Sequence, residues 1–181
     1  MAIIVRETPR LLMRSWQDSD LPAFAAINAD PNVMKYFPAP LSRAESDTMA
    51  ERIRALMQQQ GWGFWAVEVK GGSPFIGFVG LASAGDDLPC SPCVEIGWRL
   101  AAEHWGQGYA SEAANCALEL AFNTLQLTEV VSFTAENNHP SRRVMARIGM
   151  TFSGETFEHP RLPPGHPLRK HVLYRKRRQT C

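Results

Sequence analysis

The spacing of apolar residues divides this chain into short strands and medium-length helices. Residues 94–100 alternate strictly between apolar side chains and Glu, Gly or Arg, and a period of two predicts a strand with one covered face. Apolar-rich runs predict further strands at 10–14, 62–69, 75–81, 129–135, 150–158 and 170–176. Apolar residues at helical spacing predict helices over about 18–28, 42–60, 108–123 and 138–148.

Capping and turn signals support these boundaries, and the order of the elements predicts the sheet. Ser42 followed by Glu45 is a capping-box pattern, and Gly61 stands where that helix should stop. The sequence Gly-Gly-Ser at 71–73 predicts a hairpin turn. Only the strand–helix–strand segment over 94–135 predicts a parallel crossover. We therefore expect an α/β fold of the α+β kind with a mostly antiparallel sheet.

The composition is that of one globular domain spanning residues 1–181. Of the 181 residues, 45% are hydrophobic and 20% are charged, which excludes a disordered chain. No apolar run approaches the ~20 residues that cross a bilayer, and the N-terminus has no stretch that resembles a signal peptide. We therefore expect a cytoplasmic protein with no membrane partner.

The net charge of +1 hides an uneven distribution. Residues 1–158 carry 12 basic and 18 acidic side chains, whereas residues 159–181 carry 7 basic and no acidic side chains. This end fits either a contact to nucleic acid or a last strand followed by a solvated basic tail from about residue 176. No aromatic stacking platform accompanies it, so we favour the tail over a nucleic-acid partner.

Two cysteines, Cys90 and Cys93, form a C-S-P-C pair in a segment rich in turn residues. A zinc site needs four ligands, and Cys116 and Cys181 stand apart without forming a second pair. We therefore expect no bound metal.

The segment richest in chemical information joins the 94–100 strand to the following helix. It reads Glu-His-Trp-Gly-Gln-Gly-Tyr-Ala-Ser-Glu over residues 103–112. Its glycines let the backbone bend toward a ligand, and the free N–H groups at a helix start favour an anion such as pyrophosphate. The Lys-Ser or Lys-Thr of a mononucleotide P-loop is missing, and the preceding strands form meanders rather than the βαβ units of a dinucleotide fold.

In their order and spacing, several segments resemble the GNAT acyl-CoA N-acyltransferases, and in particular the branch that contains the RimJ and RimL ribosomal-protein N-terminal acetyltransferases. The resemblance covers nearly the whole chain and rests on residues 8–14, 65–67, 76–81, 95–100, 104–113, 136–145 and 148–150. It implies a GNAT fold: a mixed, mostly antiparallel, twisted sheet of about seven strands, flanked by about four helices, with a splayed central strand pair.

The resemblance also implies an acetyl-CoA site in the slot that the splayed strands open. Gly97 fits a bulge in the central strand, and backbone groups at Gly97, Trp98 and Leu100 are expected to pair with the pantetheine arm. Asn138 and Ser141 are expected to reach the pantetheine from the far wall.

The same resemblance implies which residues bind the phosphates of acetyl-CoA. The pyrophosphate is expected on the loop that contains Trp105, Gly106, Gln107, Gly108, Tyr109, Ala110 and Ser111. Arg143 is either a contact to the adenosine 3′-phosphate or an exposed helix arginine.

The implied chemistry is attack of a neutral amine on the thioester, and three groups serve it. Glu95 is a candidate base, unless it forms a salt bridge with Arg99 on the same strand face. A backbone N–H near Trp98 is a donor for the developing oxyanion. Many family members supply a tyrosine acid from the last helix, but Met145 stands there. Ser141 or a water molecule could protonate the thiolate instead, or the thiolate leaves unprotonated.

These residues predict an N-acetyltransferase that moves an acetyl group from acetyl-CoA to a primary amine, either a protein N-terminal amine or a small molecule. A second hypothesis is a non-catalytic acyl-CoA-binding module that docks RNA or a ribosome through the basic tail. The loops around 31–42 and 156–170 are expected to select the acceptor. Dimers are common in the family, so a homodimer is compatible with the sequence. Five aromatic residues are expected either in the core or at the acceptor end: Trp16, Phe24, Tyr36, Phe37 and Trp62.

Overall fold

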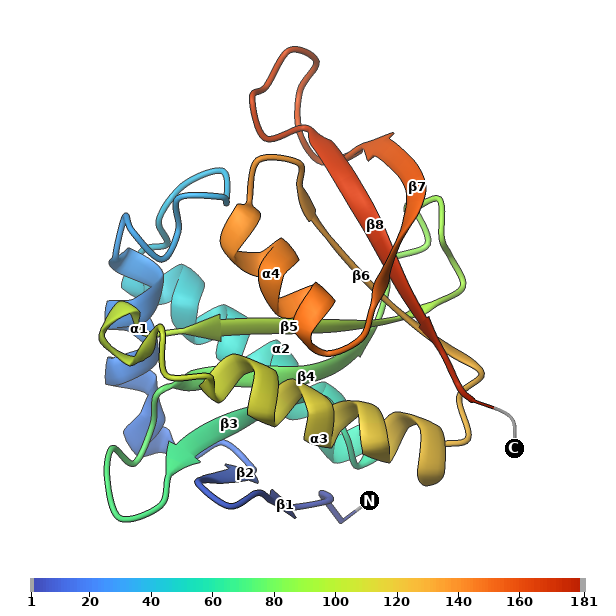
Figure 1. Cartoon of the computed structure of the whole chain (residues 1–181). Coiled ribbons are helices and arrows are strands. Elements are labelled where there is room, and N and C mark those ends of the chain that lie inside the picture. The colour runs from blue at the N-terminus through green and yellow to red at the C-terminus, as the bar shows by residue number, and fades with distance from the viewer. Residues whose placement is uncertain (1, 180–181) are drawn as a thin grey trace.

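Eight strands form one sheet, and all neighbouring strands run antiparallel except the central pair (Figure 1). The computed structural model describes residues 2–179. The strands are β1 (Arg6–Glu7), β2 (Leu11–Arg14), β3 (Phe64–Val69), β4 (Gly77–Ser83), β5 (Val94–Leu100), β6 (Glu129–Ala135), β7 (Thr151–Glu158) and β8 (Lys170–Arg177). Their order in the sheet is β1-β2-β3-β4-β5-β6-β8-β7. The fold class predicted from the sequence is therefore confirmed, with one strand more than the seven expected.

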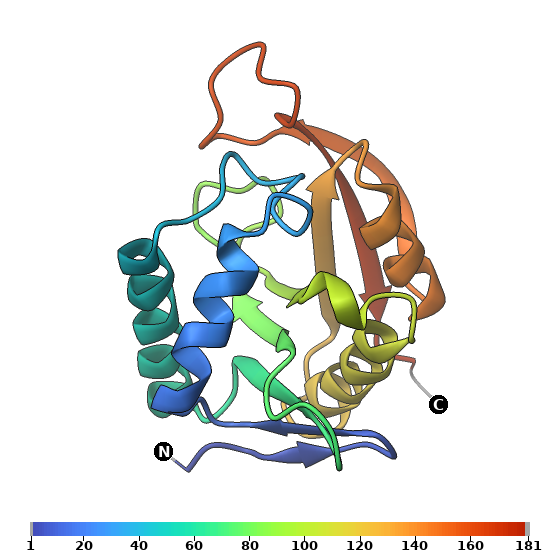
Figure 2. The same ribbon diagram turned by 90° about the vertical axis from the view of Figure 1, so that its left-hand side faces the viewer.

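The helices form two layers, one on each face of the sheet (Figure 2). They are α1 (Leu21–Ala29), α2 (Arg43–Gln60), α3 (Tyr109–Asn123) and α4 (His139–Arg147), with 3-10 turns η1 (Asp18–Asp20) and η2 (Ala102–His104). The α1 and α2 helices cover one face, and α3 and α4 cover the other. Trp65 and Phe24 are the largest fully buried side chains of the core between these layers. Within residues 2–179, no helix combines the length and the apolar character needed to cross a bilayer.

The ends of α2 follow from its sequence as predicted. The Ser42 hydroxyl accepts a hydrogen bond from the Glu45 N–H at 3.3 Å, and the Glu45 carboxylate accepts one from the Ser42 N–H at 2.7 Å. At the other end Gly61 adopts φ +82°, a left-handed conformation that glycine tolerates best. The capping box and the glycine stop are both confirmed.

The central strands β5 and β6 separate soon after they meet. They pair in parallel at a single position, Glu95 with Val131. One residue further, the Ser132 hydroxyl donates to the Ile96 carbonyl at 2.9 Å, in place of a backbone bond. The predicted parallel crossover and the splayed pair are both confirmed.

The prediction that a bulge at Gly97 causes this splay is wrong. The register of β5 on β4 is unbroken from Val94 opposite Ser83 to Leu100 opposite Gly77. A bulge would add one residue to one strand and shift that register. The slot therefore opens because β6 diverges, while β5 stays fully paired with β4.

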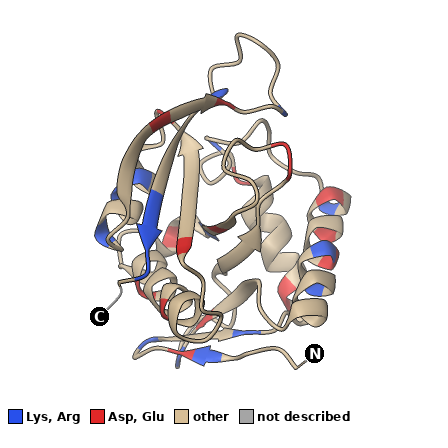
Figure 3. Ribbon diagram, turned by 90° about the vertical axis from the view of Figure 1, so that its right-hand side faces the viewer, with Lys and Arg blue, Asp and Glu red and all other residues tan. Residues whose placement is uncertain are grey.

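The basic residues near the C-terminus belong to a strand rather than to a tail that begins at about residue 176. β8 runs to Arg177, and its basic end lies beside β6 (Figure 3). Glu129 of β6 forms ion pairs with Arg175 at 2.6 Å and with Arg177 at 3.0 Å. The Lys176 ammonium donates to the Ile148 carbonyl at 2.6 Å. The last two residues, 180–181, lie outside the described residues.

Candidate active site

A cavity of about 840 Å³ occupies the slot between β5 and β6. Residues 95–100 of β5 line one wall, and α4 with residues 132–134 of β6 lines the other. The loop before α3 closes one end, and segments 32–38 and 159–162 line the opposite end. Most of the site residues predicted from distant parts of the sequence therefore meet around one cavity, and Gln107 and Arg143 are the exceptions.

The backbone of β5 divides its polar groups between β4 and this cavity. Just beyond each end of β4, the Ala101 N–H donates to the Ile76 carbonyl and the Ala84 N–H donates to the Cys93 carbonyl, both at 2.9 Å. Hydrogen-bonded pairs alternate along an antiparallel ladder, so the odd-numbered residues of β5 bond to β4. The backbone groups of the even-numbered Trp98 and Leu100 consequently face the cavity.

This alternation corrects one predicted contact and supports two others. Gly97 is odd-numbered, so its backbone bonds to β4 and is not free to pair with a pantetheine arm. The Leu100 carbonyl accepts from the Trp105 indole at 2.9 Å, while the Leu100 N–H donates to no atom of residues 2–179. The free β5 groups are thus the N–H and C=O of Trp98 and the N–H of Leu100.

The loop before α3 presents a cluster of unpaired N–H groups. Gly106 and Gly108 adopt φ +75° and +82°, which turns the backbone around the cavity. The first bond at the start of α3 runs from the Glu112 N–H to the Gly108 carbonyl at 3.0 Å, so earlier N–H groups have no helical acceptor. The helix dipole adds a partial positive charge at the same point. The predicted cradle residues line the cavity except Gln107, whose side chain instead reaches the Glu103 carbonyl at 3.4 Å.

A polar network that sequence reasoning missed holds this loop in place. The Arg10 guanidinium pairs with Glu112 at 2.6 Å and donates to the Gln107 carbonyl at 2.9 Å. The Thr8 hydroxyl donates to the same carboxylate at 2.6 Å. These residues are about a hundred positions apart in the chain, so no local pattern signals their contact. We refer to Thr8, Arg10 and Glu112 as the loop anchor.

The α4 wall is organised by a cap. The Asn138 side chain accepts from the Ser141 N–H at 3.3 Å and donates to the Thr134 hydroxyl at 2.8 Å, so it caps α4 and fixes the wall. The Ser141 hydroxyl accepts from the Trp98 indole at 3.2 Å across the slot. Met145, at the position of the expected tyrosine, is buried against the cavity.

Arg143, the remaining predicted cofactor contact, lies elsewhere on α4. Its side chain is exposed and is not part of the cavity wall. A role for it with a 3′-phosphate stays a prediction.

Glu95 is the titratable group that the cavity changes most. Burial raises the pKa of its carboxyl to about 7, and the positive charge of Arg161 partly opposes this rise. No residue among 2–179 forms a hydrogen bond or ion pair with its side chain. The alternative in which Arg99 neutralises Glu95 is therefore wrong. At neutral pH this carboxyl is divided between its acid and base forms, as proton transfer requires.

The far end of the cavity has an aromatic wall built from Phe133, His159 and His171, and the Phe157 ring packs against Phe133 and His171. The His159 and His171 rings contact each other at a tilt of 50°, with centroids 4.8 Å apart. Burial lowers the pKa of His171 to about 4 and also lowers the pKa of His159, so both rings are neutral at pH 7.

Of the aromatic residues assigned from the sequence to the core or the acceptor end, Tyr36 and Phe37 line this cavity. Trp16 and Phe24 are buried in the main core, with ring centroids 4.8 Å apart. Trp62 is partly buried and packs against the same core.

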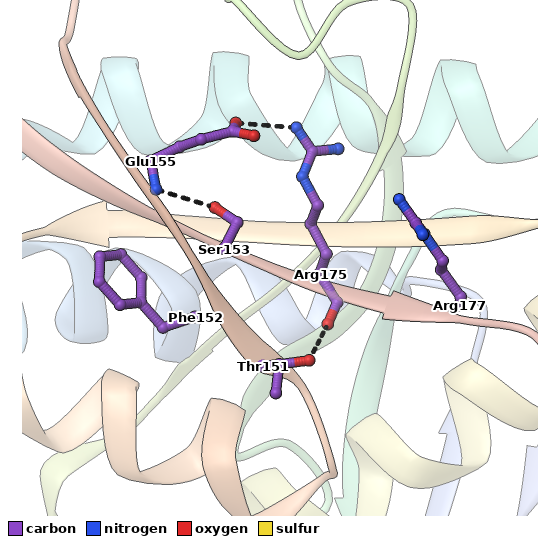
Figure 4. A pocket seen from close by; sticks show the side chains of 6 residues that line it. All are labelled: Thr151, Phe152, Ser153, Glu155, Arg175 and Arg177. Atoms are coloured by element: carbon purple, nitrogen blue, oxygen red, sulfur yellow. Dashed lines mark hydrogen bonds and ion pairs between the residues drawn. The ribbon is translucent and has the colours of Figure 1, made fainter.

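A second hollow, of about 620 Å³, lies on β7 and β8 and has a different character. Figure 4 shows its lining of Thr151, Phe152, Ser153, Glu155, Arg175 and Arg177. Arg175 is already paired with Glu155 at 2.9 Å, and the hollow contains no loop of free N–H groups. The chemistry described above belongs to the β5–β6 cavity alone.

The fold and the cavity define a GNAT acetyltransferase. Residues 10–151 match the family described as "Acetyltransferase (GNAT) domain", and the chain belongs to this family. Its members use acetyl-CoA as the acetyl donor.

Individual relatives agree with this assignment. The chain is 34% identical over 148 residues to the FsC-acetyl coenzyme A-N(2)-transacetylase of Aspergillus fumigatus, covering 77% of this chain and 62% of that protein. The crystal structure of the acetyltransferase from Agrobacterium tumefaciens strain C58 superposes with a TM-score of 0.78 at 29% identity, covering 98% of this chain and 96% of that one. Mycobacterium smegmatis RimJ in complex with CoA-disulfide has the same fold, with a TM-score of 0.71 at 20% identity and coverage of 92% and 81%.

Proposed function

We propose that this chain is an acetyl-CoA-dependent N-acetyltransferase that acts on a primary amine in the β5–β6 cavity. The observation that carries the proposal is a juxtaposition. One cavity combines the free N–H groups before α3, the free backbone groups of Trp98 and Leu100, and the unpaired carboxyl of Glu95. The first two sets fit the phosphates and the amides of acetyl-CoA, and the third fits an amine that must lose a proton.

Different residues of the cavity bind different parts of acetyl-CoA. N–H groups from Gly106 to Ser111 bind the pyrophosphate, helped by the dipole of α3. The Trp98 carbonyl and the Leu100 N–H bind the amides of the pantetheine arm as a neighbouring strand would, which leaves the Trp98 N–H free. Asn138 contributes through the α4 cap, which places Ser141 opposite Trp98.

When bound, acetyl-CoA supplies an acetyl thioester, and the chain supplies the proton transfers. Glu95 removes a proton from the attacking amine, whose nitrogen forms the C–N bond while the C–S bond breaks. The Trp98 N–H donates to the carbonyl oxygen as negative charge develops there. The Ser141 hydroxyl accepts from the Trp98 indole and keeps its own hydrogen, with which it donates a hydrogen bond to the leaving thiolate, and the proton that Glu95 took from the amine balances the release of CoA as a thiol.

The acceptor is a protein N-terminal amine, as in the RimJ and RimL branch, or a small-molecule amine. Residues of both loops that the sequence indicated for acceptor choice, including Tyr36 and Leu162, line the far end of the cavity. The non-catalytic alternative gains no support, because Arg175 and Arg177 form ion pairs within the sheet instead of standing free for RNA.

Thermal unfolding with acetyl-CoA, with NAD⁺ and ATP as controls, tests the cofactor. At 100 times its dissociation constant a ligand adds about 2.7 kcal/mol, which for a domain of this size raises Tm by roughly 5–11 °C. We expect the shift with acetyl-CoA alone, followed by release of CoA when primary amines are added. Equal shifts with ATP, or none with acetyl-CoA, would contradict the proposal.

A further inference from the structure

We infer that Arg99 forms an anion subsite for the acceptor, so that the amine substrate also carries a carboxylate. The inference rests on the proposed acetyltransferase function and adds the class of acceptor to it. It starts from the state of the Arg99 side chain, which is 8% exposed and lines the cavity.

Arg99 is a buried cation without an anionic partner. Its Nη1 donates to the neutral Asn28 side chain at 2.7 Å and contacts the Met49 sulfur at 3.6 Å. Its Nε has no acceptor, and no carboxylate among residues 2–179 lies within ion-pair distance. Phe37 packs on the guanidinium, 4.2 Å from the ring centroid, and provides no charge. A buried charge normally has a partner, because desolvating it alone is costly.

The other buried arginine of this chain shows the usual solution. Arg14, 7% exposed, forms two bonds of 2.9 Å to the Asp20 carboxylate and a third of 2.9 Å to Glu68. Both arginines are equally buried, so burial alone does not explain the unpaired state of Arg99. The difference is that Arg99 borders a cavity, where a substrate can supply the missing anion.

The position of Arg99 indicates that the anion it binds belongs to the acceptor and not to acetyl-CoA. Arg99 contacts α1 and α2 through Asn28 and Met49, whereas the N–H cradle belongs to α3 on the opposite layer. The side chains of Glu95 and Arg99 lie on one face of β5, with Gly97 between them, because alternate residues of a strand point the same way. Gly97 has no side chain, and the Phe64 ring packs over it, 3.3 Å from where a Cβ would stand, so an aromatic face of the cavity wall lies between the carboxyl and the guanidinium.

This geometry describes an acceptor lying along β5. Its amine reaches Glu95, and its carboxylate reaches Arg99. Glu95 and Arg99 are four residues apart, about 13 Å along the strand. After the reach of both side chains is subtracted, a short spacer of several bonds separates the two groups of the substrate.

Matched acceptors test the inference: ω-amino carboxylates with two to five methylenes, and the corresponding carboxamides, assayed by CoA release. For the native chain we expect KM to be at least about tenfold lower for the best carboxylate than for its amide, the effect of a charged hydrogen bond. Arg99→Met should bring this ratio close to one. Arg43→Met, which removes a surface arginine, should leave the ratio unchanged.

A second variant keeps the inference testable if Arg99→Met does not fold. Asn28→Asp places a carboxylate on Arg99 from within the protein, so it should raise Tm and also abolish the preference for carboxylates. Equal KM values for acid and amide in the native chain, or a preference that survives both variants, would overturn the subsite while leaving acetyl transfer intact. Absence of CoA release from every acceptor, without a thermal shift by acetyl-CoA, would instead count against the proposed function.

Discussion

Glu95 and Arg99 show how position within a strand decides the state of a charged residue. Opposite charges on one face of a predicted strand suggest a salt bridge, but these residues are four positions apart, about 13 Å along an extended chain. Each side chain instead takes the properties of its surroundings. Burial raises the pKa of Glu95 to about 7 and lowers the pKa of Arg99 to about 10. Both residues therefore border the same cavity without an ion-pair partner.

The pKa of Glu95 predicts how the rate depends on pH. A base must be ionised to accept a proton, so kcat/KM should fall as pH decreases through about 7, where the Glu95 carboxyl becomes protonated. Glu95→Gln should lower kcat by about 10²–10⁴-fold. A stopped-time assay of CoA release from pH 5.5 to 9 measures both effects. If the variant kept the native rate, Glu95 could not be the base.

The same carboxyl predicts an opposite effect on stability. Its pKa is higher in the folded chain than the ordinary value of 4.5, so the folded state holds the proton more tightly and loses stability as pH rises from about 4.5 to 7. Glu95→Gln removes this penalty and should stabilise the fold by up to about 3 kcal/mol at pH 8. Near pH 4 the two chains should have similar Tm values. Thermal unfolding at both pH values measures the difference, and equal Tm values at pH 8 would show that the carboxyl is not destabilised by burial.

At the scale of single elements, the loop before α3 combines conformational freedom with an external anchor. Gly106 and Gly108 supply left-handed backbone conformations, and the Arg10–Glu112 ion pair ties the first turn of α3 to the residue that precedes β2. The loop therefore keeps its N–H groups in place without intrahelical bonds. An element that binds through its backbone depends on conformation more than on side-chain chemistry.

Paired glycine substitutions test this dependence. Gly106 and Gly71 both have positive φ, +75° and +70°, and neither has an atom within 4 Å of an added Cβ. Gly106→Ala and Gly71→Ala should each cost roughly 1 kcal/mol of stability. Only Gly106→Ala should weaken acetyl-CoA binding, because Gly71 lies in the β3–β4 turn. Isothermal titration of both variants makes the comparison, and equal affinities would argue against the cradle.

Elements with strong local signals could be predicted from the sequence, and features that depend on distant contacts could not. β6 has the predicted bounds 129–135 because apolar and β-branched residues are concentrated there, and α2 begins at the predicted capping box. The two-residue β1 has no pattern of its own and exists only through pairing with Leu12 and Met13. Likewise, the loop anchor and the unpaired state of Arg99 depend on residues far away in the chain.

For the whole molecule, a buried ion-pair network connects the first strands to the α1 layer. Arg14 of β2 binds Asp20 of η1, Glu68 of β3 and the Pro74 carbonyl. Because Asp20 directly precedes α1, this network fixes the start of α1 against the sheet. Arg14 and Asp20 are both buried, so the loss of the Asp20 charge leaves a desolvated guanidinium with less compensation.

The network predicts an uneven response to removal of an acidic group. Asp20→Asn leaves Arg14 underpaired in a buried site and should cost about 3 kcal/mol, or roughly 6–12 °C in Tm. Asp47→Asn removes the exposed partner of Arg43, 2.9 Å away, and should cost less than about 1 kcal/mol. Chemical unfolding of both variants gives the two values. Similar losses would mean that burial of the Arg14–Asp20 pair has no special weight.

β5 and β6 pair at a single position, so few hydrogen bonds connect the two halves of the sheet. One half contains β1 to β5, and the other contains β6 to β8. In hydrogen exchange this division should appear as an alternation along β5. The amides of Trp98 and Leu100 should exchange rapidly in the free protein, while those of Gly97 and Arg99, bonded to β4, stay protected. Bound acetyl-CoA would supply hydrogen-bond acceptors for both even-numbered amides, slow their exchange alone, and join the two halves into one cooperative unit.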